Sequence, residues 1–381
     1  MGSAATRADS PARTSRGRGS IRDALDAASE SATVHIDGHA VALTHLERIY
    51  WPGVDEWDQP AITKRDYLHY LAAVAPLMLP HLRDRPLTLF RWPEGIAGRR
   101  VLEKHWNITL PPFVERVDVF SDAKGHQDQY ILCNNLATLL WLAHMGTLEF
   151  HAWHSRIRPG AEAPDAADGF ASSTAALEAS VLERPDYVLF DLDPFIAPDS
   201  THAREPSFNA DAFAKVTSVA YALESMLAGI GLRALVKTSG KTGLHVIVPI
   251  KRTLRYDAVR EMARFIGEQL RRAHPSDITL DWQVKKRTGK VFVDANMNVR
   301  GKSISVAYSP RGLRGAPVSM PVTWRELATI DPLDFRLPTV LPRLRRRGDA
   351  WAGWLDRAQN VEKALSRDVA SRAGANGEQR G

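Results

Sequence analysis

The alternation of apolar and polar residues along the chain predicts short strands interrupted by helices. Val34-His35-Ile36 and Val41-Ala42-Leu43, on either side of Asp37-Gly38, have the pattern of a β-hairpin. After Thr63 the apolar residues recur at helical spacing as far as Pro80, and Thr63 is a typical helix cap. The same reasoning predicts a helix over 134–145 between strands at 86–91 and 148–156.

The second half of the chain repeats this mixture. Its predicted elements are helices over 209–227 and 255–273 and strands over 232–237, 244–250, 291–294 and 303–308. Residues 238–243 form the turn between the first two of these strands. A basic segment, 285–290, precedes the third. The last predicted helical region opens with the basic cluster 343–347.

Composition suggests where the folded part begins and ends. Residues 1–33 are rich in Arg, Ser, Ala and Gly and poor in apolar side chains, which predicts a disordered basic tail. Residues 159–185 are rich in Ala, Ser, Asp and Pro, which is typical of a long mobile insertion. We therefore expect one folded domain over 34–340, followed by a helical extension and polar tail over 341–381.

Asp191 and Asp193 follow a run of strand-forming residues in the middle of the chain. Because side chains alternate along a strand, both carboxylates should lie on one face where the apolar run Tyr187–Phe190 stops, and Pro194 should end the ladder. Two neighbouring carboxylates repel each other unless a cation lies between them, and hard oxygen ligands suit a divalent cation. A strand end with two solvated acids is the alternative.

The turn at 238–243 contains Gly240-Lys241-Thr242, which suggests a phosphate-binding loop. A Walker A motif is excluded, because Leu235 stands where its first glycine would be and a strand follows the turn. The turn still offers backbone N–H groups beside Ser239, Lys241 and His245, and such donors suit phosphate oxygens. Downstream, Asp294 ends the strand at 291–294 and supplies the third carboxylate that a two-cation site would need.

Overall composition narrows the class of protein. The 381 residues are 44% hydrophobic, with 50 Lys and Arg against 44 Asp and Glu and a sequence pI near 9.4, which is compatible with a polyanionic partner. A single cysteine, Cys133, excludes an internal disulfide and favours a reducing cytoplasm. The longest apolar run, Leu136 to Met145, is too short to span a bilayer, so no membrane partner is expected.

Taken in order, these segments resemble the polymerase domain of bacterial ligase D, a branch of the archaeo-eukaryotic primase superfamily. The resemblance runs from about Leu43 to Arg336. The matching segments are Leu43-Thr44-His45, Tyr50-Trp51-Pro52, Ile62-Thr63-Lys64, Leu139–Gly146, Asp191-Leu192-Asp193-Pro194, Lys237–Gly240 with Gly243-Leu244-His245, Val293-Asp294, Tyr308-Ser309 with Arg311, and Gly315–Ser319.

The resemblance implies an α+β primase-polymerase fold, with a central, mainly antiparallel sheet flanked by helices and an N-terminal α/β lobe beside it. It also implies template-directed nucleotidyl transfer at DNA gaps or double-strand breaks, with ribonucleotides preferred. Asp191, Asp193 and Asp294 would hold two Mn²⁺ or Mg²⁺ ions. Further partners would be nucleoside triphosphates, a Ku-type end-binding protein and a separate ligase, because the sequence has no Lys-x-Asp-Gly ligase motif.

The resemblance also assigns binding residues. In the incoming nucleotide's pocket it places Ser239, Lys241, His245, His151 and Arg311. It places Arg48 and Lys64 on the 5′-phosphate of a gap or break, where a charge-assisted contact suits the chemistry. It places Lys104 and Arg287 on the template or DNA end.

One departure concerns the segment after Asp294. The family commonly reads Tyr-Leu-Arg-Asn there, whereas this chain has Ala295-Asn296-Met297-Asn298. Met297 therefore stands where the family arginine is usual, and Arg300 is a candidate replacement.

Three other functions remain open at this level. A phosphohydrolase could use Asp191 as nucleophile and Asp193 as acid or base, although Phe195 and the mid-chain position of the motif argue against it. A non-catalytic DNA-end-binding module would use only the basic surface. A primase would start chains without a primer, and an assay on unprimed template would separate it from a primer-extending enzyme.

Overall fold

The structure is a computed structural model that describes residues 14–106, 108–158, 169–195 and 209–364. The helices are α1 Thr14–Ala27, α2 Lys64–Leu82, α3 Leu136–His144, α4 Thr174–Ala179, α5 Ala210–Gly229, α6 Tyr256–Ala273, α7 Trp324–Leu327 and α8 Leu337–Arg347. The strands are β1 Ala32–Ile36, β2 His39–Leu43, β3 Ile49–Trp51, β4 Ile62–Thr63, β5 Leu87–Arg91, β6 Val101–Glu103, β7 Arg116–Ser121, β8 His126–Ile131, β9 Thr147–Trp153, β10 Tyr187–Pro194, β11 Leu235–Thr238, β12 Leu244–Pro249, β13 Ile278–Thr279, β14 Val291–Asp294, β15 Ser303–Ser305 and β16 Pro321–Val322.

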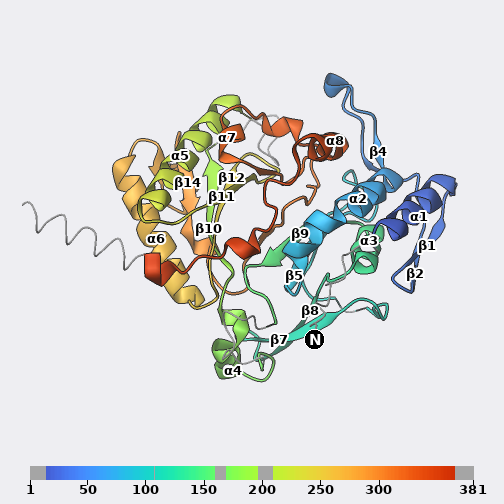
Figure 1. The fold of residues 1–381 in the computed structure, drawn as a ribbon, viewed down its shortest axis with the longest axis horizontal. Coiled ribbons are helices and arrows are strands. Elements are labelled where there is room, and N and C mark those ends of the chain that lie inside the picture. The colour runs from blue at the N-terminus through green and yellow to red at the C-terminus, as the bar shows by residue number, and fades with distance from the viewer. Residues whose placement is uncertain (1–13, 107, 159–168, 196–208, 365–381) are drawn as a thin grey trace, which may run out of the picture.

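Two sheets organise the molecule. The central sheet has six strands in the order β13-β14-β10-β12-β11-β16, and all neighbours are antiparallel except β13 and β14. The second sheet, β15-β9-β5-β6, is antiparallel throughout. Figure 1 shows the central sheet with α5 and α6 in one half and α1, α2 and α3 in the other. The α+β class and the central, mainly antiparallel sheet are therefore confirmed.

The two faces of the central sheet have different neighbours. Gly267 of α6 lies against Val293, whose side chain points to the opposite face from its neighbour Asp294. Helix α6 thus covers the face away from the acids. The face that carries Asp191 lies opposite β9 and β15 of the second sheet, because His151 of β9 and Ser305 of β15 line the same cavity as Asp191.

In the N-terminal lobe, the predicted hairpin and the predicted helix after Thr63 are both present. Asp37 and Gly38 adopt φ values of 50° and 84°, the left-handed conformation of a tight hairpin turn between β1 and β2. The Thr63 hydroxyl accepts a hydrogen bond from Asp66 N, and the Asp66 carboxylate accepts one from Thr63 N, so α2 begins with a capping box. The helix ends at Leu82, slightly beyond the predicted stop at Pro80.

The structure corrects the expectation that residues 1–33 do not pack. Residues 14–27 form α1, in which Ile21 and Leu25 are buried. Their four-residue spacing places both on one helical face, a signal that the polar composition hides. Arg65 donates to the carbonyls of Ala28 and Ser29 at 2.7 and 2.8 Å, just beyond the end of α1. Residues 1–13 lie outside the described residues.

The predicted mobile insertion at 159–185 is also ordered over its second part. Residues 174–179 form α4, and Leu177 and Leu182 are buried against the β7–β8 hairpin. Val181 is buried against Phe170. A few apolar side chains close together are enough to fix this short segment. Residues 159–168 lie outside the described residues.

The C-terminal boundary differs from the expected one. Helix α8 begins at Leu337 and crosses the proposed boundary after residue 340. Beyond it, Trp351, Trp354 and Val361 are buried in the main core, and Trp351 Nε1 donates to Val236 O in β11 at 3.1 Å. The segment up to 364 is thus part of the same folded unit, and residues 365–381 lie outside the described residues. None of the described helices is both long and apolar enough to cross a bilayer.

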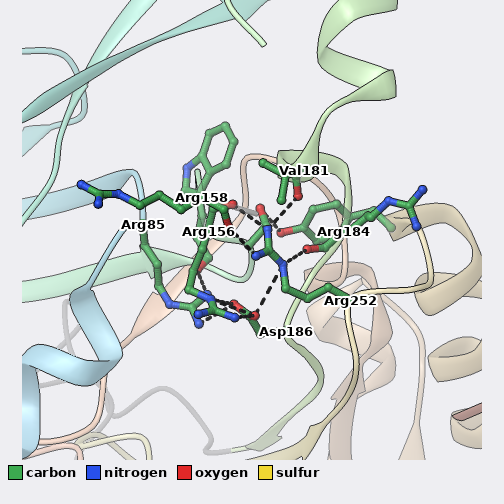
Figure 2. A network of polar contacts seen from close by, with 10 residues as sticks. Arg85, Arg156, Arg158, Val181, Arg184, Asp186 and Arg252 are labelled. Carbon is green, nitrogen blue, oxygen red and sulfur yellow. Dashed lines mark hydrogen bonds and ion pairs between the residues drawn. The ribbon is translucent and has the colours of Figure 1, made fainter. Parts of the chain in front are cut away.

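A buried charge cluster fixes the start of β10. Asp186, the residue before the strand, forms ion pairs with Arg85 at 2.6 Å, Arg156 at 2.9 Å and Arg252 at 3.6 Å, as Figure 2 shows. Burial raises the pKa of Asp186, but the three arginines outweigh this and lower it below its usual value. Arg252 also donates to the carbonyls of Arg156 and Val181, which ties the segment after β9 to the segment before β10.

Candidate active site

A row of four charged or polar side chains crosses the middle of the central sheet. Asp191 of β10 is directly opposite Asp294 of β14 on one side and His245 of β12 on the other. His245 is in turn opposite Lys237 of β11. Because paired residues share a face, all four side chains lie on the same side of the sheet. Asp193, two residues after Asp191, joins them there.

The carboxylates in this row lack the compensation that buried acids require. Burial, Asp193 and Asp294 together raise the pKa of Asp191 well above its usual value. Burial also raises the pKa values of Asp193 and Asp294, although Arg287 acts in the opposite direction on both. Within the described residues, Oδ1 of Asp191 receives no hydrogen bond, while Nε2 of His245 lies 3.4 Å away. This excess negative charge favours a bound cation.

The donor set fits a hard divalent cation that also contacts a substrate. Carboxylate oxygens are the ligands that Mg²⁺ and Mn²⁺ prefer. Across the described ranges, no three Asp, Glu, His or Cys side chains converge closely enough to form a ready-made metal centre. Magnesium sites commonly use one or two carboxylates plus substrate phosphates rather than a complete protein cage. The arrangement matches that type.

A tight glycine turn lies beside the acids. Gly240 has φ +73°, and a Cβ there would lie 2.7 Å from the Arg311 side chain. A Cβ on Gly243 would lie 2.2 Å from the carbonyl oxygen of Leu192 in β10. Only glycines allow so close an approach. Ser239 Oγ accepts hydrogen bonds from the backbone N–H groups of Lys241 and Gly243 at 3.1 and 3.2 Å, which holds the turn in shape.

Acids and turn share a cavity of about 440 Å³. Its wall brings together every residue predicted for the nucleotide pocket and two of the three acids. The lining residues are His151, Asp191, Asp193, Pro194, Ser239, Lys241, Thr242, His245, Met297, Ser303, Ile304, Ser305 and Arg311. Such a volume falls in the range of small-molecule sites.

Glu149 organises one side of this cavity, and the sequence did not single it out. One carboxylate oxygen lies 3.0 Å from Nη2 of Arg311 and 3.2 Å from Nε2 of His151, and the other accepts from Gly312 N at 3.0 Å. Burial, as the leading cause, lowers the pKa of His151 to about 4, so the ring is neutral near pH 7. Glu149 and His151 are two residues apart in β9 and therefore lie on the same face of the strand, and this spacing was the only signal for Glu149 in the sequence.

Lys237 is the second residue that sequence reasoning missed. Its Nζ lies 2.6 Å from Nδ1 of His245 and also donates to Ser319 Oγ. Burial, and then the nearby Lys237, lower the pKa of His245 well below its usual value, so this ring is also neutral near pH 7. The lysine directly precedes the turn at 238–243, and in the sequence it stood out only as part of the matching segment Lys237–Gly240.

Arg48 and Lys64 are brought together away from the cavity. The Lys64 backbone N–H donates to Arg48 O at 2.8 Å, and the Lys64 side chain is buried with its Nζ 5.9 Å from the Tyr50 ring centre. Burial, and then the charge of Arg48, lower the pKa of Lys64 to about 8. Two neighbouring cations, one of them buried, favour an anion at this place.

The two predicted template contacts differ in position. The Arg287 guanidinium lies 3.5 Å from the ring centre of Phe292, and Phe292 is directly opposite Asp193. Arg287 is therefore beside the acids. Lys104 is exposed just after β6, at the edge of the second sheet, and does not line the cavity.

Arg300 does not replace the arginine that the family has at position 297. Its guanidinium forms ion pairs with Glu183 and, at 2.6 Å, with Asp122, which joins β14's downstream segment to the β7–β8 hairpin. Met297 itself lines the cavity. The cavity wall is thus apolar at this point.

Comparisons with known proteins agree with this geometry. The family model for the LigD primase-polymerase domain matches residues 63–351. The multifunctional non-homologous end joining protein LigD of Pseudomonas aeruginosa is 30% identical over 351 residues, covering 91% of this chain and 36% of that protein. The bifunctional LigD of Bacillus subtilis is 27% identical over 288 residues, covering 75% of this chain and 40% of that protein.

A solved structure extends the likeness to three dimensions. The polymerase domain of Mycobacterium tuberculosis ligase D, in complex with DNA, superposes with a TM-score of 0.68 at 28% identity, covering 84% of this chain and 99% of that one. The chain thus spans little more than a third of its full-length curated relatives but nearly all of the solved polymerase domain. It belongs to the LigD primase-polymerase domain family.

Proposed function

We propose that this chain is a template-directed nucleotidyltransferase that adds nucleotides to a primer 3′-hydroxyl at DNA gaps or breaks. The observation that carries the proposal is a cavity whose wall combines Asp191, Asp193 and His245 with a phosphate-type glycine turn, while Asp294 lies directly opposite Asp191 on the next strand. Family membership and a structural relative in complex with DNA support the same reading.

The acids and the turn would divide the work on the nucleotide. Asp191, Asp193 and Asp294 would hold two Mn²⁺ or Mg²⁺ ions, which in such sites activate the attacking hydroxyl and stabilise the leaving pyrophosphate. Lys241, the turn N–H groups and Arg311 would bind the triphosphate. Glu149 would keep Arg311 and His151 oriented, because it contacts both.

The remaining basic residues would bind DNA. Arg48 and Lys64 would receive the 5′-phosphate on the far side of a gap, since the buried Lys64 lacks a carboxylate partner among the described residues. Arg287, beside the acids, would contact the template near the reacting end, and Lys104 would contact it further away. We also expect ribonucleotides to be preferred, a separate ligase to seal the product and a Ku-type protein to hold the ends.

Primer extension tests the proposal. The substrate is a gapped duplex with a 5′-phosphate, supplied with Mn²⁺ and either ribo- or deoxyribonucleotides. We expect templated addition that disappears in Asp191→Ala, while DNA binding remains. Retained DNA binding without any addition by the unmodified protein would contradict catalysis and favour an end-binding module. Products on unprimed template would identify a primase.

A further inference from the structure

Trp282 is a large aromatic side chain that the fold leaves in solvent. It lies in the connection between β13 and β14, residues 280–290, at the edge of the central sheet. Its surface is 66% exposed, and that of Val284, two residues further on, is 63% exposed. Single exposed apolar residues are ordinary and need no explanation. The surroundings of this tryptophan are not ordinary, and the proposed chemistry does not use it.

The Trp282 ring lies next to the row of acids. It contacts Phe292 of β14 edge to face, with the ring centres 6.0 Å apart. Phe292 is directly opposite Asp193, so its side chain is on the face of the sheet that carries the acids. Trp282 is therefore at the border of that face, separated from Asp193 by one aromatic ring.

Arg287 holds Trp282 in place. Its guanidinium donates to the backbone carbonyls of Asp281 and Trp282 at 3.0 and 2.7 Å. It also lies 3.5 Å from the ring centre of Phe292 and 5.5 Å from that of Trp282. A ring that is already ordered loses little conformational freedom when it binds a ligand, and this raises affinity.

The other side chains of this connection are mainly cationic. Lys285, Lys286 and Arg287 follow the tryptophan, and Asp281 is the one acid between β13 and β14. Lys286 pairs with Asp281 at 3.3 Å, whereas Lys285 is exposed and has no ion-pair partner among the described residues. An open aromatic ring beside cations is the combination that binds single-stranded nucleic acid, because the ring stacks on a base and the cations contact phosphates.

A protein partner fits this surface less well. Stable protein interfaces bury about 800 Å² on each side, and lysine is depleted in them. The connection offers two exposed large apolar side chains, Trp282 and Val284, and the residues between and directly after them are polar or charged. One open ring among cations matches a nucleobase and its flanking phosphates.

We propose that Trp282 stacks on an unpaired base of DNA beside the reacting centre, with Lys285 on a flanking phosphate. The proposal deepens the nucleotidyl transfer proposed above, and it rests on that function for the identity of the bound strand as the template. The contact itself is a binding contact, so it is measurable without metal or nucleotide.

Binding to a template overhang gives the first test. Fluorescence anisotropy in EDTA compares a duplex that ends in an unpaired 5′ overhang with the same duplex made blunt. Stacking on one base is worth at least about fivefold in affinity. We expect Trp282→Ala to lose that factor on the overhang and to bind the blunt duplex normally. Trp282→Phe keeps an aromatic ring and should lose less.

Phe265→Ala is the matched control. Phe265 is 63% exposed but belongs to α6, the helix on the face away from the acids, so its loss should leave both affinities unchanged. The unfolding temperature of each variant shows that it is folded. Unchanged affinity of Trp282→Ala for the overhang would overturn the proposal and leave the surface to a protein partner. An equal loss on both duplexes would contradict stacking on an unpaired base.

Abasic sites locate the stacked base. One nucleotide of the overhang at a time is replaced by an abasic residue. We expect one position at which this change weakens binding to the unmodified protein but not to Trp282→Ala, because both changes remove the same contact. Additive losses at every position would contradict the proposal.

Salt dependence separates stacking from charge. Each phosphate contact to a single strand contributes about 0.7 to the slope of log K against log salt concentration. Lys285→Ala should lower the slope by that amount, and Trp282→Ala should leave it unchanged. Lys251→Ala is the control, because Lys251 is exposed just after β12. An equally lowered slope in Trp282→Ala would show that the tryptophan acts through the cations and would contradict stacking.

These measurements also separate the contact from the proposed function. An unmodified protein that binds the overhang but adds no nucleotide would defeat nucleotidyl transfer. The affinities of Trp282→Ala for the two duplexes would still decide the role of the tryptophan.

Discussion

Asp186 and Asp191 lie five residues apart at the two ends of one buried segment, yet their surroundings are opposite. Asp186 is surrounded by Arg85, Arg156 and Arg252, which lower its pKa (Figure 2). Burial, Asp193 and Asp294 raise the pKa of Asp191, and the charges of Lys237 and Arg311 offset this only in part. Both residues are aspartates at or next to β10, and their opposite pKa shifts come from the groups around them.

The difference separates structure from function in this fold. A buried carboxylate that is fully paired holds the chain together, and it has no capacity left for a ligand. A buried carboxylate that is short of positive charge costs stability and is ready to bind a cation. The same reasoning applies to Lys64 with the sign reversed. Burial and the neighbouring positive charge of Arg48 lower its pKa, so this site is short of negative charge.

The largest effect is expected from Asp191→Asn. The amide keeps the shape but removes the charge that would hold the cations, so templated addition should fall by at least about 10³-fold. Stability of the metal-free protein should stay equal or rise, because a repulsive charge is lost. Steady-state primer extension and thermal unfolding check both parts. A loss of activity that merely follows a loss of folded protein would contradict the assignment.

Asp186→Asn should do the reverse. Removing one partner of a buried ion cluster leaves arginines uncompensated, which costs about 3–5 kcal/mol in free energy of unfolding. Urea unfolding measures this loss. Activity per folded molecule should remain near normal at low temperature, because none of the cavity residues contacts Asp186. An abolished activity in fully folded protein would show that the two clusters are coupled.

Divalent cations should stabilise only one of the two clusters. At a Mn²⁺ concentration of 100 times its Kd, binding adds about 2.7 kcal/mol to the stability of the folded state. We expect a matching rise in unfolding temperature for the unmodified protein and for Asp186→Asn, and none for Asp191→Asn. An equal rise in all three would place the metal elsewhere.

The two acids should also respond oppositely to pH. The raised pKa of Asp191 means that its ionised form destabilises the metal-free fold above that pKa, and acidification relieves the cost. The lowered pKa of Asp186 means that its stabilisation is present above the unfolded value of about 3.9 and is lost as pH falls through the folded pKa. The unfolding temperatures of Asp191→Asn and the unmodified protein should therefore converge as the pH falls from the raised pKa of Asp191 towards the unfolded value of about 3.9. Those of Asp186→Asn and the unmodified protein should stay apart.

The smallest effect is expected at the phosphate pair. Lys64→Ala should weaken binding to a 5′-phosphorylated gap by about tenfold, the size of one charge-assisted hydrogen bond, and leave an unphosphorylated gap almost unchanged. Fluorescence anisotropy with both substrates measures the ratio, and Lys251→Ala is the exposed control. Equal losses on both substrates would reduce Lys64 to a general contribution of charge.

Local patterns in the sequence predicted the strand and turn that carry most of the site. Alternation along β10 placed Asp191 and Asp193 on one face, and the residues at 238–243 predicted a turn with donors for phosphate beside them. Strand pairing is a long-range property, so the direct opposition of Asp191 and Asp294 was not visible. Glu149 and Lys237 were missed for the same reason, because their partners come from distant segments.

Composition was a weaker guide than periodicity at the edges of the fold. The polar tail and the polar insertion each hide a few apolar residues at the right spacing, such as Ile21 with Leu25. The average composition of some thirty residues does not reveal such a pair of apolar side chains. Burial of a short helix depends on a few contacts, which only the packed structure reveals.

The most direct test compares Asp186→Asn and Asp191→Asn in one experiment. Both proteins are assayed for templated addition on a 5′-phosphorylated gap with Mn²⁺, at a temperature where circular dichroism shows each of them folded. Near-normal addition by Asp186→Asn and none by Asp191→Asn is the predicted result. Comparable activity of the two variants would contradict the assignment of the uncompensated acids as the reacting centre.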